Sequence, residues 1–131
     1  MTPNDEHSEN TMIWIRFASF LMLLGVVLGA FGAHALKGTL SEDGKTVYQT
    51  AVLYHLVHGL GLFAVGWLAT LRPHEPLIDK AGWAFVLGII LFSGSLYLLS
   101  VTGVKKLGII TPFGGLAFLL GWLCLALAAK G

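Results

Sequence analysis

FASFLMLLGVVLGAFGA, residues 17–33, contains no charged side chain and does not alternate apolar with polar residues. A strand of a membrane β-barrel alternates in this way over about ten residues. Only helices and closed barrels satisfy their backbone hydrogen bonds in lipid, so the absence of alternation favours a helix. The stretch therefore predicts a helix that crosses a membrane.

Charged residues elsewhere in the chain are confined to short segments between long uncharged blocks. The uncharged blocks lie between Arg16 and Lys37, Lys45 and Arg72, Lys80 and Lys105, and Lys106 and Lys130. Each is about the ~20 residues that a helix needs to cross ~30 Å of hydrocarbon. Of the 131 residues, 56% are apolar and only 11% are charged. These are too few charges for the surface of a soluble domain.

We therefore predict an all-α fold, an integral membrane four-helix bundle. A polar N-terminal tail is expected over residues 1–12, and a single transmembrane domain over residues 13–129. The spans are expected at about 13–36, 46–71, 81–101 and 107–129. Lys and Arg are divided equally between the two ends of such a bundle, so the positive-inside rule assigns no orientation.

The charges also bear on the partners of the chain. The formal net charge is +1, and the adjacent pair Lys105-Lys106 is the strongest basic feature. Binding to nucleic acid needs clustered Lys and Arg, so we expect no nucleic-acid partner. The partners that this composition suggests are membrane lipid and either a second copy of the chain or a partner membrane subunit. Cys124 is expected to be a buried structural thiol.

Small residues recur at helical spacing in the predicted spans. Helices in lipid associate through close backbone approach at such residues, so we expect these glycines at helix contacts. They are Gly25, Gly29, Gly32, Gly59, Gly66, Gly114, Gly115 and Gly121. Trp14 and Trp83 fall near the starts of their spans, a position typical of interfacial aromatic residues. Pro112 indicates either that the last helix starts at about Thr111 or that its first turn is bent.

Most polar side chains of the spans fall in one half of the membrane if the spans run antiparallel. This is the half nearest the 37–45 and 102–106 connections. Ionisable groups at such depth usually face the interior of a bundle, where they find partners. We therefore expect a polar pocket shared by several helices. Its predicted residues are His34, Gln49, Tyr54, His55, His58, Ser93, Ser95, Tyr97 and Thr111.

Three interpretations of this polar pocket stay open. Its side chains could form interhelical hydrogen bonds, each worth about 0.6–2 kcal/mol. They could bind or conduct a small polar molecule, an ion or a lipid headgroup. They could also ligate a metal or haem, because imidazole binds Zn, Cu and Fe and His55 and His58 have HxxH spacing. The same half offers no third strong ligand such as Cys or a carboxylate, so we assign no metal and no cofactor.

Four motifs resemble those of the YgdD-like family, small multi-pass membrane proteins grouped as a domain of unknown function. They are LGAFGAHALK (28–37), YQTAVLYHLVHGLGL (48–62), LFSGSLYLL (91–99) and TPFGGLAFLLGW (111–122). The resemblance implies a protein of the bacterial cytoplasmic (inner) membrane with four spans and no established activity. The matching motif positions are Gly29, Phe31, Gly32, His34, Tyr54, His58, Ser93, Gly94, Ser95, Tyr97, Thr111, Pro112, Gly114, Gly115 and Trp122.

The sequence offers no recognisable set of nucleophile, base and acid, so we do not expect an enzyme. The leading hypothesis is a non-enzymatic membrane protein whose bundle surface or polar pocket interacts with partner subunits or lipid. The alternative is a small transporter or channel component for a small polar solute or ion. That alternative would use His34, His55, His58 and Tyr97.

Overall fold

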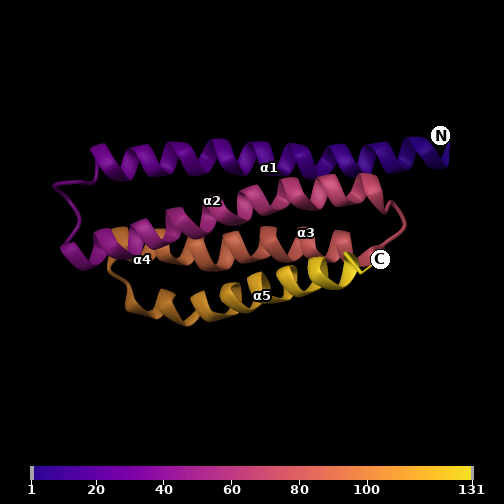
Figure 1. Ribbon diagram of the computed structural model, residues 1–131. Helices are drawn as coiled ribbons and strands as arrows, with labels where there is room; N and C mark the ends of the chain where they lie inside the picture. The colour runs from indigo at the N-terminus through magenta and orange to yellow at the C-terminus, as the bar shows by residue number, and fades with distance from the viewer. Residues whose placement is uncertain (1, 131) are drawn as a thin grey trace.

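The computed structural model describes residues 2–130, and no strand occurs among them. Figure 1 shows the helices side by side along a common direction, with both chain termini at one end, the terminal end. The α1–α2 and α4–α5 connections lie at the opposite end, which we call the loop end. The elements are α1 (Pro3–His34), α2 (Glu42–Leu71), α3 (Pro76–Gly88), the π-helix η1 (Ile89–Gly94), α4 (Ser95–Thr102), the 3-10 helix η2 (Lys105–Ile109) and α5 (Thr111–Ala128).

Four helical stretches of the described chain are long and apolar enough to cross a membrane. They are Ser8–His34, Glu42–Leu71, Pro76–Thr102 and Lys105–Ala128. The predicted all-α fold with four membrane-spanning helices is therefore confirmed. Each stretch lies within a few residues of the span expected from the charges, since charged groups are costly in lipid and mark the ends of the apolar blocks.

Helix α1 begins at Pro3, inside the segment that we expected as a polar tail. Proline suits the first helical position, and acidic side chains in the first turn interact favourably with the helix dipole. The backbone N–H and the hydroxyl of Thr2 donate to the Asp5 carboxylate at 2.8 and 2.7 Å, and these bonds lower the pKa of that carboxyl. The boundary between tail and transmembrane domain stays a prediction.

The other helices begin and end at residues with clear local causes. Helix α5 starts at Thr111, so Pro112 lies in its first turn, as in the first of the two predicted alternatives. The residues just before it form the 3-10 helix η2. Gly103 ends α4 with φ +70°, a left-handed conformation that glycine adopts without steric cost. At the terminal end, Arg72 donates from Nη1 to the Lys130 carbonyl at 2.6 Å, which ties α2 to the C-terminal segment.

The contacts between the four spans are not equivalent. Helix α1 packs mainly on α2, and α5 packs on α3 and η1. Helix α2 lies between these pairs, in contact with α3, η1 and α4. Figure 1 shows the result, with α1 and α5 on opposite sides of the molecule. Helix α1 therefore has one packed side, while much of its remaining surface is exposed.

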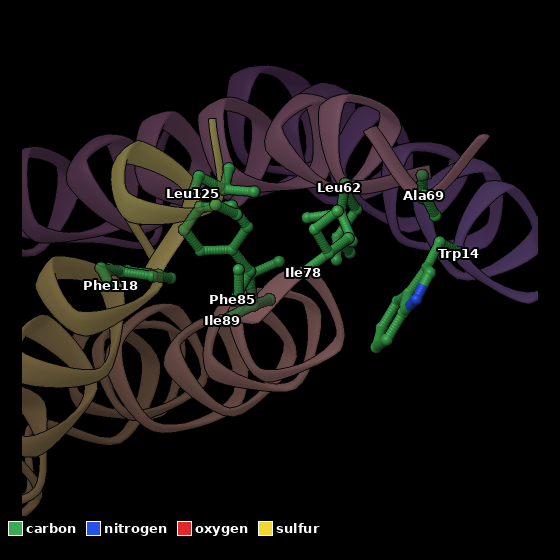
Figure 2. Close-up of a cluster of buried hydrophobic side chains, with 12 residues drawn as sticks. Trp14, Leu62, Ala69, Ile78, Phe85, Ile89, Phe118 and Leu125 are labelled. Atoms are coloured by element: carbon green, nitrogen blue, oxygen red, sulfur yellow. The ribbon is translucent and has the colours of Figure 1, made fainter. Parts of the chain in front are cut away.

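The apolar core lies between α2, α3 and α5, towards the terminal end (Figure 2). Trp14 of α1 reaches this core and is only 2% exposed. Its ring lies where a Cβ on Gly82 of α3 would be, and its Nε1–H donates to Asp79 Oδ1 at 2.8 Å. Trp14 is thus a core residue and not the interfacial residue that we expected. Trp83, in contrast, is exposed.

Most of the glycines that we expected at helix contacts face a large side chain of a neighbouring helix. On α1, Gly25, Gly29 and Gly32 face Leu56, Val52 and Tyr48 of α2. On α2, Gly59 faces Met22 and Gly66 faces Ile15. On α5, Gly121 faces the Phe85 ring and Gly114 faces the backbone of Phe92, whereas Gly115 stands off from Phe92. Small residues thus let these helices approach closely.

Candidate functional site

His55 joins three helices near the middle of α2. Its Nε2 lies 2.8 Å from the Leu21 carbonyl oxygen of α1, and its Nδ1 lies 2.9 Å from the Tyr97 hydroxyl of α4. A carbonyl oxygen only accepts, so Nε2 carries the proton and Nδ1 accepts from the Tyr97 O–H. Both ring nitrogens of this buried histidine are therefore engaged in its neutral form.

His58 joins α2 to α5 with the opposite tautomer. Its Nδ1 donates to the Tyr54 carbonyl at 2.7 Å, so its Nε2 accepts from the Trp122 Nε1–H at 3.0 Å. The imidazole stacks on the Phe118 ring with centroids 3.5 Å apart and planes 10° apart. His58 is thus held by two hydrogen bonds and by the ring beside it.

Two serines tie the π-helical region to its neighbours. Ser93 of η1 donates to the Ala51 carbonyl of α2 at 2.8 Å. Ser95 donates to the Phe92 carbonyl at 3.0 Å, and its oxygen lies 2.7 Å from the Thr111 hydroxyl at the start of α5. Since the single proton of Ser95 is already used, Thr111 donates to it. These contacts fix η1 and α4 between α2 and α5.

The structure divides the predicted polar pocket into separate pairs. His55 meets Tyr97, Ser95 meets Thr111, and His58 donates to the Tyr54 carbonyl. The second bond of His58, to Trp122, and the bond of Ser93 to Ala51 go to groups outside the predicted set. The Tyr54 ring packs against the Phe92 ring, with centroids 4.5 Å apart and planes tilted by 36°. Most of the side chains expected in one pocket are thus distributed along the contacts of α2, α4 and α5.

Two of the predicted residues lie away from these contacts. His34 is exposed at the last residue of α1, and Gln49 is exposed on α2. Helix α1, which His34 ends, packs mainly on α2. Gln49 instead lines a groove between α1 and α2.

Sequence reasoning missed three polar contacts between helices. The Tyr48 hydroxyl of α2 donates to the Leu28 carbonyl of α1 at 2.5 Å, and its ring lies 5.2 Å from that of Tyr97. Seven residues, two helical turns, separate Tyr48 from His55, a spacing that could have placed both on one face. The other missed contacts, Trp14–Asp79 and Trp122–His58, involve indole groups that only the tertiary structure brings to their acceptors.

The polar groups inside the described part of the bundle are satisfied. Among the side chains that the structure describes, those of residues 2–130 apart from positions 4 and 7, no buried nitrogen or oxygen lacks a hydrogen-bond partner. Among these described side chains, no group of three or more His, Cys, Asp or Glu is placed to hold a metal ion. His55 and His58 also have no nitrogen lone pair left for a metal, because each accepts one hydrogen bond and donates another.

Residues 28–115 match the family described as "Protein of unknown function (DUF423)", more than half of the chain. The chain belongs to the DUF423 family. Among its relatives is the UPF0382 membrane protein YwdK of Bacillus subtilis (strain 168), 46% identical over 117 residues, 89% of this chain and 95% of the relative. The UPF0382 membrane protein SH2409 of Staphylococcus haemolyticus (strain JCSC1435) is 41% identical over 116 residues, which are 88% of this chain and 93% of the relative.

No solved structure matches the chain. The DUF423 match covers Tyr48, His55, Ser93, Tyr97 and Thr111, so it contains most of the hydrogen bonds around α2 and α4. The names of the relatives agree with the four apolar helices, and the protein is a membrane protein of a family whose function is unknown.

Replacing Tyr97 by phenylalanine tests the hydrogen bond to His55. The variant leaves the buried Nδ1 of His55 without its donor, so we expect the free energy of unfolding in mixed micelles to fall by about 1–2 kcal/mol. Tyr54→Phe is the matched control, because no hydrogen bond of the Tyr54 hydroxyl occurs within residues 2–130 and the ring is 39% exposed. That control should change stability by less than about 0.5 kcal/mol. Equal losses in the two variants would contradict the assignment.

Proposed function

We propose that this DUF423 protein is a non-enzymatic bundle of the bacterial cytoplasmic membrane that acts by association, with lipid or with partner membrane subunits. The supporting observation is the complete pairing of its buried polar side chains within residues 2–130. A catalytic acid or base must lie within hydrogen-bond reach of the substrate atom on which it acts. The buried histidines and the Tyr97 hydroxyl are instead bonded to neighbouring helices.

The surface of α1 supports association as the mode of action. This helix packs on α2 and leaves large apolar side chains exposed, among them Phe20, Leu23 and Val27. Such a face suits lipid chains or the apolar face of another membrane helix. The location in the cytoplasmic membrane is supported by the sequence motifs and by relatives that come from bacteria.

A small transporter or channel component is the second candidate, and it has less support. A permeation path would need His55, His58 and Tyr97 to face a continuous opening. Their ring nitrogens and hydroxyl are used in hydrogen bonds within the bundle. Substituting these residues should therefore lower the stability of the protein and not a flux. If His58→Leu abolished a solute flux in proteoliposomes while the protein stayed folded, this second candidate would replace the first.

Site-specific photocrosslinking in native membranes tests the proposed association. A photoreactive residue is placed at Leu23 on α1, and the matched control places it at Leu119 on α5, a second exposed leucine. Specific association predicts an adduct of one defined mass from one face and not from the other, or lipid that stays bound during purification. Equal adducts from both faces, together with a lipid-free monomer, would contradict the proposal.

A further inference from the structure

A groove of about 580 Å³ runs between α1 and α2 at the loop end of the molecule. Its volume lies within the ~300–1,000 Å³ range of small-molecule sites. Small residues of α1, Gly29, Gly32 and Ala33, form one wall, and Val52, Leu53 and Leu56 of α2 form much of the other. Lys37, Lys45 and Gln49 are the polar side chains at its loop end. The groove is therefore apolar along its length and basic at its mouth.

The length of the groove matches one leaflet of a bilayer. Along α2, the distance from Lys45 to Leu56 is about 16 Å at ~1.5 Å per residue. Half of the ~30 Å hydrocarbon core is about 15 Å. Leu56 also lies near the middle of α2, which spans Glu42–Leu71. A molecule that fills the groove would thus place one end at the membrane surface and the other near the midplane.

The charges at the mouth favour an anionic head group. Lys37 forms no ion pair within residues 2–130, whereas Lys45 is paired with the exposed Glu42 at 2.8 Å. Lysines at this depth extend to the interface and leave their aliphatic stems on apolar surface. Basic pockets between membrane helices attract anionic lipid head groups in this way. The amide of Gln49 can add a hydrogen bond to a phosphate or ester oxygen.

We propose that this groove binds one anionic phospholipid of the leaflet at the loop end. The phosphate lies between Lys37 and Lys45, and one acyl chain lies on Ala33, Val52 and Leu56. This inference deepens the proposed association by naming the lipid class and the site. The lipid site rests on the proposed function in one respect, because both place the activity at the surface of the bundle.

Lipid retention by native mass spectrometry tests the site. Purified protein is equilibrated with equal amounts of phosphatidylglycerol and phosphatidylcholine, and inorganic phosphate is offered in a separate arm. The wild type should retain phosphatidylglycerol preferentially. Lys37→Gln/Lys45→Gln should reduce that preference by about 5- to 30-fold, since each basic residue near the surface is worth about a factor of five. Lys105→Gln/Lys106→Gln is the matched control, because it removes the same charge from η2, outside the groove.

A second pair of variants tests the apolar part of the groove. Ala33→Phe fills it and should abolish retention of the lipid, whereas Ala30→Phe adds the same bulk on an exposed position of α1 outside the groove and should not. Circular dichroism checks that both variants fold. Equal losses in the two lysine variants, retention by Ala33→Phe, or binding of phosphate alone would overturn the site. If these lipid tests fail but crosslinking still gives adducts from Leu23 and not from Leu119, the groove site is wrong and the proposed association is still supported.

Discussion

The variant Gly114→Ala is expected to lower the free energy of unfolding by about 2–3 kcal/mol, the upper part of the range for overpacked sites. A Cβ at this position would overlap the backbone nitrogen of Phe92 and lie 2.7 Å from its Cα. A side chain in the way could rotate, but the backbone of η1 is held by the bonds of Ser93 and Ser95. Relief would therefore require α5 to move away from η1.

Gly115→Ala is the matched control for this prediction. A Cβ there would lie 3.8 Å from the Phe92 ring, which is ordinary van der Waals contact. Because alanine favours the helix over glycine by about 0.5–1 kcal/mol, this variant should be neutral or slightly more stable. Unfolding of both variants by denaturing detergent in mixed micelles provides the measurement. Similar stability of the two would show that α5 does not approach η1 as closely as described.

The second large effect is expected from Trp14→Ala, with a loss of about 3–5 kcal/mol. The substitution empties the space over Gly82 and leaves the Asp79 carboxylate without its indole donor. Trp14→Phe keeps a ring in that space and loses only the hydrogen bond, so it should cost less. Trp14 is also one of the few buried side chains that α1 supplies to the core. Its loss should weaken the docking of α1 at the terminal end.

Trp67→Ala serves as the control for Trp14→Ala, because Trp67 is a tryptophan of α2 that is 62% exposed. Its removal should change stability by less than about 0.5 kcal/mol. Thermal unfolding of the three tryptophan variants in one detergent gives the comparison. If Trp67→Ala destabilised the protein as much as Trp14→Ala, the contrast between core and surface indoles would be wrong.

The four spans could be predicted from sequence because charge is a strong local signal in a membrane protein. Lys37, Lys45 and Arg72 lie within a few residues of the ends of the first two stretches, whereas Arg16 lies inside the first. The same rule places the other two stretches. The charges were used to place a membrane span from residue 13, and they do not show where the helix itself begins, at Pro3. Pro3 and the acidic first turn are helix-start signals that act whether or not the residues lie in lipid.

The candidate site was less predictable because depth along a helix does not give direction around it. His34 and His55 lie in the same predicted half of the membrane, yet only His55 faces other helices. Trp14 was expected at an interface, and its burial depends on the notch that Gly82 opens in another helix. The donor to His58 comes from Trp122, which sequence position alone does not bring to α2. Such pairings are set by tertiary packing.

The number of residues in the π-helix Ile89–Gly94 sets how α4 is rotated relative to α3 within the third span. Each residue of an α-helix turns the chain by about 100°, so deleting one residue from this segment would rotate α4 by about that angle relative to α3. Tyr97 would then point away from His55, and Ser95 away from Thr111. Related chains that keep these two bonds must therefore keep the same spacing through this segment, whereas the surface connection after His34 can vary in length.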